Sequence, residues 1–558
     1  MKVIYQGTSL LQGDKLIEQL LNPGRIIACD IETVSLTNKT IIGFGIAISP
    51  TDAFYIPVYP ETSEILPLAY LLLTRKDITK YYHNGNFDII GLRDFAKEHH
   101  FPEPDVWNIG DTNIMANVSG LWPDLHTLGN RILNNYDLFT IQELLEKARQ
   151  ETGRKDVTML DVPLEMVARK CCNDVLTTFR LIEPLQAQLT DQTRECYEVD
   201  LKLTSHLKEV EKKGFALDHD YLEQQYNKLI VEAEIYEDWA YELGFNIASP
   251  AQVGMYLANQ RVVLPLTKSG KQLDTSEEVL ERVKHPAAAE ILKYRGIRKQ
   301  LSTYIEPNLH RSRVFTHFRL DLSTGRLASF DDNLQNIPPD LRSMYNPDSG
   351  IFTWGDMSQA EMRMFAHFSQ DPVMLQAYRD GISIHEVTFR GIYPDLPYDK
   401  SSHYYTLAKS FNFAMIFNAE DGTLSSRFKV PFKLARQTKQ DWLSLYSVGH
   451  DWMQKTLDID SDYVEGIDGR RMRLPNEFER GRKHRDTCKI SYTIQGSVAS
   501  ANKRALLKVL ESSHPPDFRL QVHDEFVIDG EYDFPKYLDT IFPGVYIPFE
   551  KKSGVKWN

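Results

Sequence analysis

Two acidic segments that lie far apart in the sequence constrain the fold of this chain more than any other feature. The first spans residues 354–361 (WGDMSQAE) and the second spans residues 520–527 (LQVHDEFV). Each places an aspartate, Asp356 or Asp524, at the end of an apolar run that is typical of a β-strand. Two neighbouring strands would bring these carboxylates together around divalent metal ions. The largely helical sequence between them is then an insertion that divides one sheet into two parts of the chain.

A third segment, residues 409–417 (KSFNFAMIF), lies between the two acidic ones. Lys409, Phe413 and Phe417 are spaced i, i+4, i+8, so a helix would place a cation and two aromatic rings along one face. A nucleoside triphosphate needs a metal and a cation for its phosphates, and rings can pack on its base and sugar. The three segments together therefore indicate nucleotide chemistry.

In this order, the segments resemble the motifs of the family A DNA polymerases, the group typified by bacterial DNA polymerase I. The segment at Asp356 is similar to the family's motif A, the segment at Lys409 to motif B, and residues 523–525 (HDE) to motif C. Residues 324–338 resemble the family's primer-terminus segment, and residues 294–304 its passage from thumb to palm. The resemblance runs over nearly the whole chain. Since no 5′ nuclease segment precedes it, we expect a phage-type replicative enzyme.

The resemblance implies a multidomain α/β and α+β fold, which suits a chain of 558 residues. A ribonuclease H-like exonuclease domain would come first, followed by a right-hand polymerase with thumb, palm and fingers. The expected domains are 1–190 (3′–5′ exonuclease-like), 191–312 (thumb), 313–375 (first part of the palm), 376–504 (fingers and return to the palm) and 505–558 (second part of the palm, with motif C).

For the polymerase, the resemblance implies template-directed addition of deoxynucleotides to a primer 3′-hydroxyl. Asp356 and Asp524 would bind two Mg²⁺ ions, for which Mn²⁺ can substitute, and the backbone carbonyl of Met357 would be a further ligand. Glu525 would tune these ligands from outside the metal shell. Lys409 would bind the triphosphate. Primer-template DNA and deoxynucleoside triphosphates are therefore the expected partners.

The resemblance also implies residues that contact the nucleotide or the DNA. In the family, the residue matching Glu361 blocks the ribose 2′ position, and the residue matching Phe413 packs under the sugar and base. A Phe at 413, rather than Tyr, implies discrimination against dideoxynucleotides. The full expected set is Gln359, Glu361, His385, Phe413, Phe417, Arg326, Gln335, Asn336, Gln495 and His523.

Two departures from the family pattern concern the nucleotide. Tyr405 stands where an arginine that contacts the triphosphate is expected, so one phosphate cation is missing. Phe417 stands where a tyrosine is expected, which removes a hydroxyl that would bond to Glu361. Lys409 and His385 remain as the expected phosphate ligands.

A separate set of carboxylates occurs near the amino terminus. Asp30 and Glu32 alternate with Ile31, so a strand would project both carboxylates from one face. Residues 83–88 supply Asp88, and the helical stretch 168–174 supplies Asp174. Four carboxylates on a ribonuclease H-like sheet can hold two metal ions. In order and spacing they resemble the ligands of the DEDD 3′–5′ proofreading exonucleases.

One position departs from that exonuclease pattern. Lys170 replaces the tyrosine that orients the attacking water in the tyrosine-type domains. Because all four acidic ligands remain, we expect exonuclease activity, with Lys170 or a nearby tyrosine orienting the water. A polymerase with an inactive exonuclease domain is one alternative. A DEDD nuclease without polymerase activity is another, but it leaves the motifs at Asp356 and Asp524 unexplained.

The charge balance is unusual for a protein that grips a polyanion. The chain has 64 basic and 77 acidic residues and a net charge of −13. DNA affinity must therefore come from local basic patches. Taken alone, each basic run also suits a solvated helix face. The candidates are Lys293, Arg295, Arg298 and Lys299 in one stretch and Arg470, Arg471, Arg473, Arg480, Arg482, Lys483 and Arg485 in another.

The five cysteines lack paired zinc-binding spacing and are odd in number, so we expect reduced thiols rather than a disulfide framework. The first residues do not form a signal peptide, and no apolar run approaches the length that spans a membrane. We therefore expect a monomer that is not bound to a membrane and that lies in the cytoplasm of a bacterium or of a phage-infected host. Accessory replication partners are not indicated by any motif.

Overall fold

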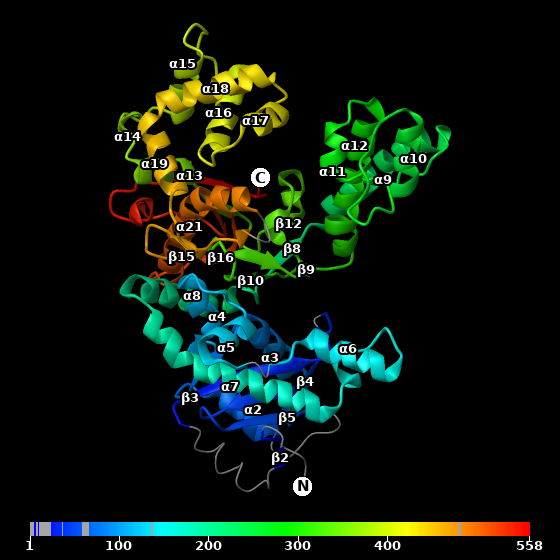
Figure 1. Ribbon diagram of the computed structural model, residues 1–558, viewed down its shortest axis with the longest axis vertical. Coiled ribbons are helices and arrows are strands. Elements are labelled where there is room, and N and C mark those ends of the chain that lie inside the picture. Colours follow the sequence, from blue (N-terminus) through cyan, green and yellow to red (C-terminus); the bar gives the residue numbers. More distant parts are fainter. Residues whose placement is uncertain are drawn as a thin grey trace.

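The protein has an elongated shape with its amino-terminal unit at one end (Figure 1). The computed structural model describes residues 5–6, 9–10, 24–35, 37–58, 66–135, 138–477 and 481–557. Above the amino-terminal unit lies a sheet formed largely by the carboxyl-terminal part of the chain. From that sheet one group of helices, drawn in green, and another, drawn in yellow, rise on different sides. This arrangement is the predicted sequence of exonuclease-like unit, thumb, palm and fingers.

The amino-terminal unit is built on a seven-stranded sheet in the order β2-β1-β5-β4-β3-β6-β7. β3 is antiparallel to β4 and parallel to β6. The strands are β1 (Tyr5–Gln6), β2 (Ser9–Leu10), β3 (Ile26–Thr33), β4 (Ile41–Ala47), β5 (Ala53–Pro57), β6 (Thr79–Tyr82) and β7 (Ile109–Asp111). The helices are α2 (Leu66–Thr74), α3 (Gly85–His99), α4 (Thr112–Val118), α5 (Leu125–Leu133), α6 (Ile141–Thr152), η1 (Met159–Asp161) and α7 (Leu164–Gln188).

Alternation along β3 decides which face its acidic residues occupy. Ile27, Cys29 and Ile31 belong to the hydrophobic core on one face of the sheet. Ala28 belongs to the core on the other face, which α7 helps to form. Because side chains alternate along a strand, Asp30 and Glu32 project on the same face as Ala28, toward α7. The strand thus buries its apolar residues on one side and offers both carboxylates on the other.

The second unit begins with α8 (Asp191–Val210), which does not belong to the helical arm. It packs instead against α4 of the first unit and against α21 (Arg482–Leu510). The arm starts at α9, so the predicted thumb, 191–312, begins too early. The arm contains α9 (His219–Glu242), α10 (Pro250–Asn259), α11 (Glu277–Arg282), α12 (Pro286–Gln300), the π-helical turn η2 (Leu301–Ile305) and η3 (Glu306–Asn308).

The palm is a four-stranded antiparallel sheet in the order β16-β17-β13-β18. Its strands are β16 (Asp517–Val522), β17 (Glu525–Asp529), β13 (Phe352–Met357) and β18 (Phe549–Gly554). A three-stranded sheet of β12 (Tyr345–Asn346), β8 (Phe215–Leu217) and β9 (Arg313–Val314) joins the base of the arm to this palm. Smaller elements are β10 (His317–Arg319), β11 (Ala328–Phe330), η4 (Leu334–Asn336), η5 (Pro339–Met344) and η6 (Lys536–Thr540).

The insertion between the two palm segments is helical, as predicted. It leaves the palm after β13 and returns through the long helix α21, so the predicted boundary between 376–504 and 505–558 falls inside one continuous helix. Its elements are α13 (Ala360–Ser369), α14 (Pro372–Arg379), α15 (Ile384–Ile392), α16 (His403–Met415), α17 (Asp421–Phe428), α18 (Phe432–Leu445), α19 (Ser447–Leu457), β14 (Tyr463–Glu465) and β15 (Arg471–Arg473).

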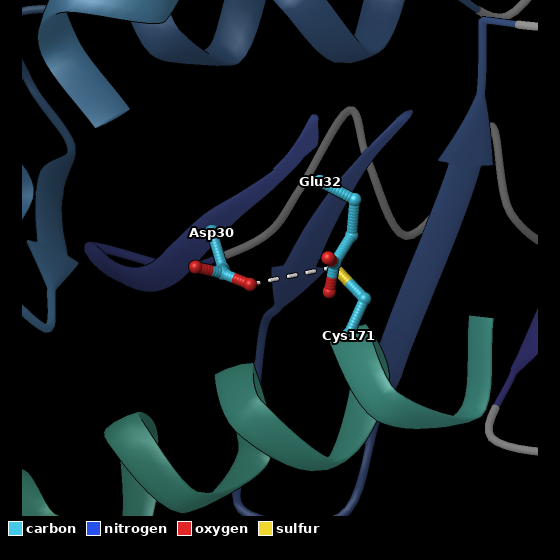
Figure 2. A group of neighbouring side chains, drawn as sticks. All are labelled: Asp30, Glu32 and Cys171. Atoms are coloured by element: carbon cyan, nitrogen blue, oxygen red, sulfur yellow. Dashed lines mark hydrogen bonds between the residues drawn. The ribbon is translucent and has the colours of Figure 1, made fainter. Parts of the chain in front are cut away.

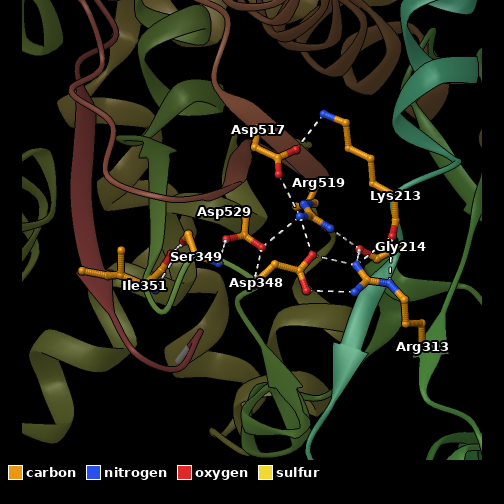
Figure 3. A network of polar contacts seen from close by, with 9 residues as sticks. All are labelled: Lys213, Gly214, Arg313, Asp348, Ser349, Ile351, Asp517, Arg519 and Asp529. Atoms are coloured by element: carbon orange, nitrogen blue, oxygen red, sulfur yellow. Dashed lines mark hydrogen bonds and ion pairs between the residues drawn. The ribbon is translucent and has the colours of Figure 1, made fainter.

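A buried arginine fixes the base of the arm to the palm (Figure 3). Arg519 on β16 donates to the Gly214 carbonyl at 2.6 Å and to Asp348 and Asp517 at 2.8 Å each. It also lies 3.0 Å from Asp529 on β17. The Arg519 side chain is 5% exposed, and of its three carboxylates only Asp529, at 3%, is also buried. Asp348 is shared with Arg313, and Asp517 is shared with Lys213. The loop before β8 is therefore tied directly to the strands that carry the palm carboxylates.

None of the five cysteines forms a disulfide, in agreement with the prediction of reduced thiols. Within the described parts of the chain, no helix is long and apolar enough to cross a membrane.

Candidate functional site

The palm sheet brings the two acidic motifs together. Asp356 is the residue before the end of β13, and Asp524 lies in the turn that joins β16 to β17. The Met357 backbone N–H donates to the Asp524 carbonyl at 3.1 Å, which connects the two segments at this point. In the sheet register, Asp356 lies opposite Glu525 on one neighbouring strand and opposite Glu550 on the other. The motifs therefore meet as predicted.

Both aspartates hold protons more tightly than usual. Burial, Asp524 and Glu550 raise the pKa of Asp356 to about 7. Burial, with Glu361 and Glu525 nearby, raises the pKa of Asp524 to about 6. Carboxylates that share a partly desolvated site repel each other when ionised. The palm carboxylates are thus arranged to favour a nearby cation.

Glu525 is held outside this group of carboxylates. Its Oε1 accepts from Trp557 Nε1 at 2.9 Å and lies 3.3 Å from Arg342 Nη1. The Arg342 guanidinium also lies over the Trp557 ring, 4.4 Å from its centroid. These contacts orient Glu525 beside Asp356 rather than into the cavity. This arrangement suits the predicted role of Glu525 in tuning the ligands, which stays a prediction.

A cavity of about 710 Å³ opens beside Asp356 and Asp524. That volume is within the range of small-molecule binding sites, about 300–1,000 Å³. Its walls come from the palm, from α13, α15 and α16, and from α21. Among the predicted residues, those that line it are Arg326, Asp356, Gln359, Glu361, His385, Lys409, Phe413, His523 and Asp524.

Helix α16 presents Lys409 and Phe413 to the cavity, one turn apart. Lys409 is exposed and Phe413 is half-buried. The helical spacing also predicted Phe417 on this face. That prediction is wrong, because α16 ends at Met415. Phe417 lies in the closing turn, before Asn418 in the left-handed conformation, and packs against the core. Only two of the three residues therefore face the cavity.

His385 on α15 belongs to a buried hydrogen-bond network that the sequence did not predict. Its Nδ1 accepts from Asn412 Nδ2 at 2.9 Å. Asn412 Oδ1 in turn accepts from Thr388 Oγ1 and from Trp442 Nε1, each at 2.8 Å. Burial and nearby Lys409 lower the pKa of His385 to about 4. A neutral ring that accepts at Nδ1 carries its proton on Nε2, so His385 is a fixed hydrogen-bond donor.

Glu361, on the first turn of α13, pairs with Arg326 at 2.7 Å. Burial raises the pKa of Glu361 even though Arg326 opposes the shift. Phe417 lacks the hydroxyl that was expected to bond to Glu361, and Arg326 is the partner of Glu361 instead. Gln359, which precedes α13 in the left-handed conformation, accepts weakly from the Tyr378 hydroxyl at 3.4 Å.

The predicted DNA ligands differ in how they are used. The Gln335 side chain accepts from the Ser329 N–H at 3.0 Å and donates to the carbonyls of Leu327 and Gln521 at 3.2 and 2.9 Å. It therefore braces the palm in this structure. Asn336 is exposed and lines a second cavity of about 610 Å³ between the arm and the palm. His523 is exposed in the β16–β17 turn.

Gln495 lies half-buried in the middle of α21. It is not among the described residues that line either cavity. A contact between Gln495 and the DNA minor groove stays a prediction, as do the contacts of Gln335, Asn336 and His523 with substrate.

The amino-terminal carboxylates also come together. Asp30 and Glu32 project from β3 toward α7, which carries Asp174. Asp88, on α3, accepts from the Ile31 N–H at 3.0 Å. Figure 2 shows Asp30 and Glu32 facing α7, where the Cys171 thiol donates to Asp30 Oδ2 at 3.7 Å. One possible ligand atom from each of Asp30, Glu32 and Cys171 lies within 4.8 Å of the others.

Lys170, which the sequence analysis placed at the position of a water-orienting tyrosine, enters this cluster from α7 and contacts two of the carboxylates directly. Its Nζ lies 2.7 Å from Glu32 Oε1 and 2.8 Å from Asp174 Oδ2. Burial raises the pKa of Asp30 and of Glu32, and it raises the pKa of Asp88 to about 8. The spacing of Lys170 and Asp174, four residues apart on a helix, was a readable signal for a pair. The partner from β3 had no local signal.

The predicted basic patch of residues 470–485 is largely used inside the protein. Arg470 is 1% exposed, and its two Nη atoms each lie 2.8 Å from Asp200 on α8. Lys503 on α21 also contacts Asp200 at 2.9 Å. The prediction that Arg470 binds DNA is therefore wrong, because this residue joins α8 to the palm. A basic run in the sequence cannot show that its charge is already paired.

Two other members of the patch are also committed to contacts inside the protein. Arg473 stacks on the Trp122 ring of the amino-terminal unit and donates to the Gly120 carbonyl at 3.2 Å. Arg485 donates to the Pro475 and Ser461 carbonyls. Arg480 lies outside the described residues. The members that remain at the surface are Arg471, Arg482 and Lys483, with Arg482 and Lys483 the most exposed.

The first basic stretch, on α12, is more open than the second. Lys293 and Lys299 are exposed, and Lys299 lines the cavity between the arm and the palm. Arg298 is half-buried, whereas Arg295 is committed to the Thr275 carbonyl. A phosphate-binding role for this stretch stays a prediction.

Comparison with known proteins gives two family matches. The family described as "DNA polymerase family A" matches residues 219–540, and the family described as "3′-5′ exonuclease" matches residues 8–190. DNA polymerase I of Chloroflexus aurantiacus is 28% identical over 569 residues, covering 93% of this chain and 58% of that protein. DNA polymerase I of Bacillus subtilis is 30% identical over 425 residues, covering 70% of this chain and 48% of that protein. The chain thus spans less than two thirds of these relatives.

A solved structure is also similar. It is the POL domain of Pol1 from M. smegmatis in complex with DNA primer-template and dNTP, and it matches with a TM-score of 0.76 at 20% identity. The match covers 98% of each chain. At this identity, the likeness shows that the two chains share a fold.

Proposed function

Because this chain belongs to DNA polymerase family A and carries a 3′–5′ exonuclease domain, we propose that it extends a primer on template DNA with deoxynucleoside triphosphates. The observation that carries the proposal is the convergence of Asp356 and Asp524 at one cavity that Lys409 and Phe413 also line. We propose that the enzyme acts as a cytoplasmic monomer.

The palm carboxylates suit divalent metal ions. Among the described residues, neither Asp356 nor Asp524 forms a salt bridge. Burial raises the pKa of both carboxyl groups more than the nearby charges of Lys552 and Arg326 lower them. Mg²⁺ bound there, as two ions by our proposal and with Mn²⁺ as a substitute, would supply charge neutralisation and a more acidic primer hydroxyl. The Met357 carbonyl is a candidate additional ligand.

The rest of the cavity binds and orients the nucleotide. The exposed ammonium of Lys409 provides positive charge for the triphosphate, and the ring of Phe413 provides an apolar surface for the sugar and base. His385, neutral and fixed by Asn412, donates from Nε2 to a phosphate oxygen. Glu361, held by Arg326, lines the same cavity, and by our proposal its bulk excludes a ribose 2′-hydroxyl. By our proposal, these residues bind and orient the triphosphate but take no part in bond making or breaking.

The proposal is tested by primer extension with Mg²⁺ and deoxynucleotides. We expect Asp356→Ala to lower the extension rate roughly 1,000-fold, because losing several kcal/mol of charge stabilisation costs about tenfold for every 1.4 kcal/mol. Asp395→Ala is a matched control, because this aspartate is exposed and lies outside the cavity. Equal rates for Asp356→Ala and Asp395→Ala would contradict the proposal.

The amino-terminal carboxylates differ from the palm carboxylates, because two of them already form salt bridges. Lys170 contacts Glu32 and Asp174 directly, so the cluster already contains a cation. The family match identifies residues 8–190 as an exonuclease domain, but a match of this kind does not show that the domain is active. No catalytic step is therefore assigned to Asp30, Glu32, Asp88 and Asp174.

A further inference from the structure

Lys170 occupies the centre of the carboxylate cluster in the amino-terminal unit. Its Nζ lies 2.7 Å from Glu32 and 2.8 Å from Asp174, and the three side chains are 8%, 2% and 9% exposed. Distances this short are those of charge-assisted hydrogen bonds. Because all three groups are buried, solvent screens the pairs only weakly. The ammonium is a structural part of the cluster rather than a passing contact.

A divalent ion and this ammonium would compete for the same oxygens. Mg²⁺ and Ca²⁺ bind carboxylate oxygens at roughly 2.0–2.6 Å and need several oxygens that point at one centre. Here Glu32 Oε1 and Asp174 Oδ2 both point at Lys170. A metal ion bridging those two carboxylates would meet a positive charge at hydrogen-bond distance from its own ligands. Binding would require that Lys170 leave its buried position.

The other two carboxylates also receive protons from the chain. Asp30 Oδ2 accepts from the Cys171 thiol, whose pKa is raised well above its usual value by burial. Asp88 Oδ1 accepts from the Ile31 N–H. Within the described residues, Asp174 Oδ1 is a buried oxygen of the cluster without a partner. The group whose ligand atoms lie within 4.8 Å of one another, Asp30, Glu32 and Cys171, thus contains a thiol held protonated and a carboxylate that Lys170 already contacts.

We propose that the Lys170 ammonium is a permanent counter-ion that takes the place of a divalent metal ion, so that the amino-terminal centre neither binds Mg²⁺ nor shortens DNA. The cluster then stabilises the domain as a salt-bridged core. This inference concerns the amino-terminal unit and does not depend on the proposed polymerase function. It favours the polymerase with an inactive exonuclease domain over the active proofreader.

Metal binding is the direct test, measured as Mn²⁺ bound per chain by electron paramagnetic resonance. The full chain carries Asp356→Ala and Asp524→Ala, so that ions at the palm do not contribute. We expect this background to bind the same amount of Mn²⁺ with or without Asp30→Ala. We expect Lys170→Ala to add at least one Mn²⁺ per chain, with an affinity at least tenfold tighter than in the background.

Thermal melting gives a second readout of the same change. In EDTA, Lys170→Ala leaves Glu32 and Asp174 unpaired, so we expect a lower Tm that rises when Mn²⁺ is added. The Tm of the background should not respond to Mn²⁺. Lys97→Ala is the control, because Lys97 is an exposed lysine on α3 of the same unit. If Lys170→Ala does not fold, Lys170→Gln removes the charge with less loss of volume.

Three results would overturn the proposal. The first is Mn²⁺ bound by the background protein and lost with Asp30→Ala. The second is a folded Lys170→Ala or Lys170→Gln protein that binds no more Mn²⁺ than Lys97→Ala. The third is shortening of single-stranded DNA by the otherwise unaltered chain that Asp30→Ala abolishes, which would return Lys170 to a role in orienting water. The comparison of background and Asp30→Ala needs no Lys170 variant.

Discussion

At the scale of single residues, the cavity owes its chemistry to side chains that neighbours hold in place. Arg326 fixes Glu361, and Asn412 fixes His385, with Thr388 bonded to Asn412 in turn. A side chain that is held before the substrate arrives loses less conformational freedom on binding. We therefore expect substitutions at Glu361 and His385 to change substrate selection or stability in ways that can be measured separately.

Glu361 should control sugar selection through its bulk. We expect Glu361→Ala to raise ribonucleotide incorporation relative to deoxynucleotide incorporation by about 10–100-fold, the range that a single steric contact in a pocket can supply. Glu361→Gln keeps the size of the side chain and should retain most of the discrimination. The ratio is measured with single-nucleotide additions of each sugar type. A ratio that does not change in Glu361→Ala would show that this residue does not contact the ribose.

His385 should make the protein sensitive to acid. Burial, with Lys409 nearby, lowers its folded pKa to about 4, below the unfolded value of about 6.5. Its contribution to stability is therefore fully present above pH 6.5 and is lost as the pH falls toward 4. The Gln side chain of His385→Gln can still accept from Asn412 but cannot take up a proton. We therefore expect its free energy of unfolding to fall by about 2 kcal/mol less than that of wild type between pH 7.5 and 4.5.

This pH effect is measured by denaturant unfolding at both pH values. His310→Gln is the matched control, because His310 is exposed, and it should follow wild type. Parallel losses in all three proteins would mean that His385 is protonated as easily in the folded chain as in the unfolded one.

At the scale of elements, the register of β13 with β17 places the palm carboxylates, and the arm is fixed to the same strands. Arg519 on β16 contacts three carboxylates, of which Asp529 is buried, and holds the loop before β8. We expect Arg519→Ala to destabilise the protein by about 3 kcal/mol, because it leaves the buried Asp529 carboxylate without its ion-pair partner. Asp348 keeps Arg313 and Asp517 keeps Lys213, so these exposed carboxylates add little to the loss.

An exposed arginine provides the comparison for Arg519. Arg282 pairs with Glu278 on α11 of the arm, and both side chains are largely exposed. Arg282→Ala should change the unfolding free energy by less than about 0.5 kcal/mol. The two variants are compared by denaturant unfolding, and similar effects would mean that the Arg519 network adds no more than a surface pair.

The sequence predicted some of these elements well and others not at all. Asp356 and Asp524 were identifiable because each ends a strand within a longer motif, and the alternation of β3 placed Asp30 and Glu32 correctly. The spacing on α16 failed at Phe417 because helical periodicity does not show where a helix ends. The contacts of Lys170 with β3 had no local signal, because they arise only when distant segments pack.

At the scale of the whole molecule, several of the basic residues predicted to bind DNA are committed to contacts inside the protein. Asp200 on α8 receives both Arg470 and Lys503, and Arg473 stacks on Trp122. Burial lowers the pKa of Lys503 to about 8, with Arg470 adding to the shift. With a net charge of −13 and these cations committed, the DNA binding that we propose must use basic residues elsewhere on the surface.

Asp200 should therefore be important for holding α8, which packs against α4 of the amino-terminal unit, to α21 of the second unit. We expect Asp200→Asn to destabilise the junction by about 3–5 kcal/mol, because Arg470 and Lys503 lose their shared carboxylate while still buried. Calorimetry should then show separate melting of the two units. Glu198→Gln, an exposed position on the same helix, should melt like wild type. Unchanged melting of Asp200→Asn would show that other contacts determine the junction.

The most direct measurement of the central claim is single-nucleotide addition to a labelled primer, with four templates that differ only in the next base. With Mg²⁺, we predict that the wild-type chain adds the complementary deoxynucleotide on each template and that Asp356→Ala adds none at a comparable rate. Addition that ignores the template, or equal addition by Asp356→Ala, would contradict the assignment of the palm cavity as a DNA polymerase active site.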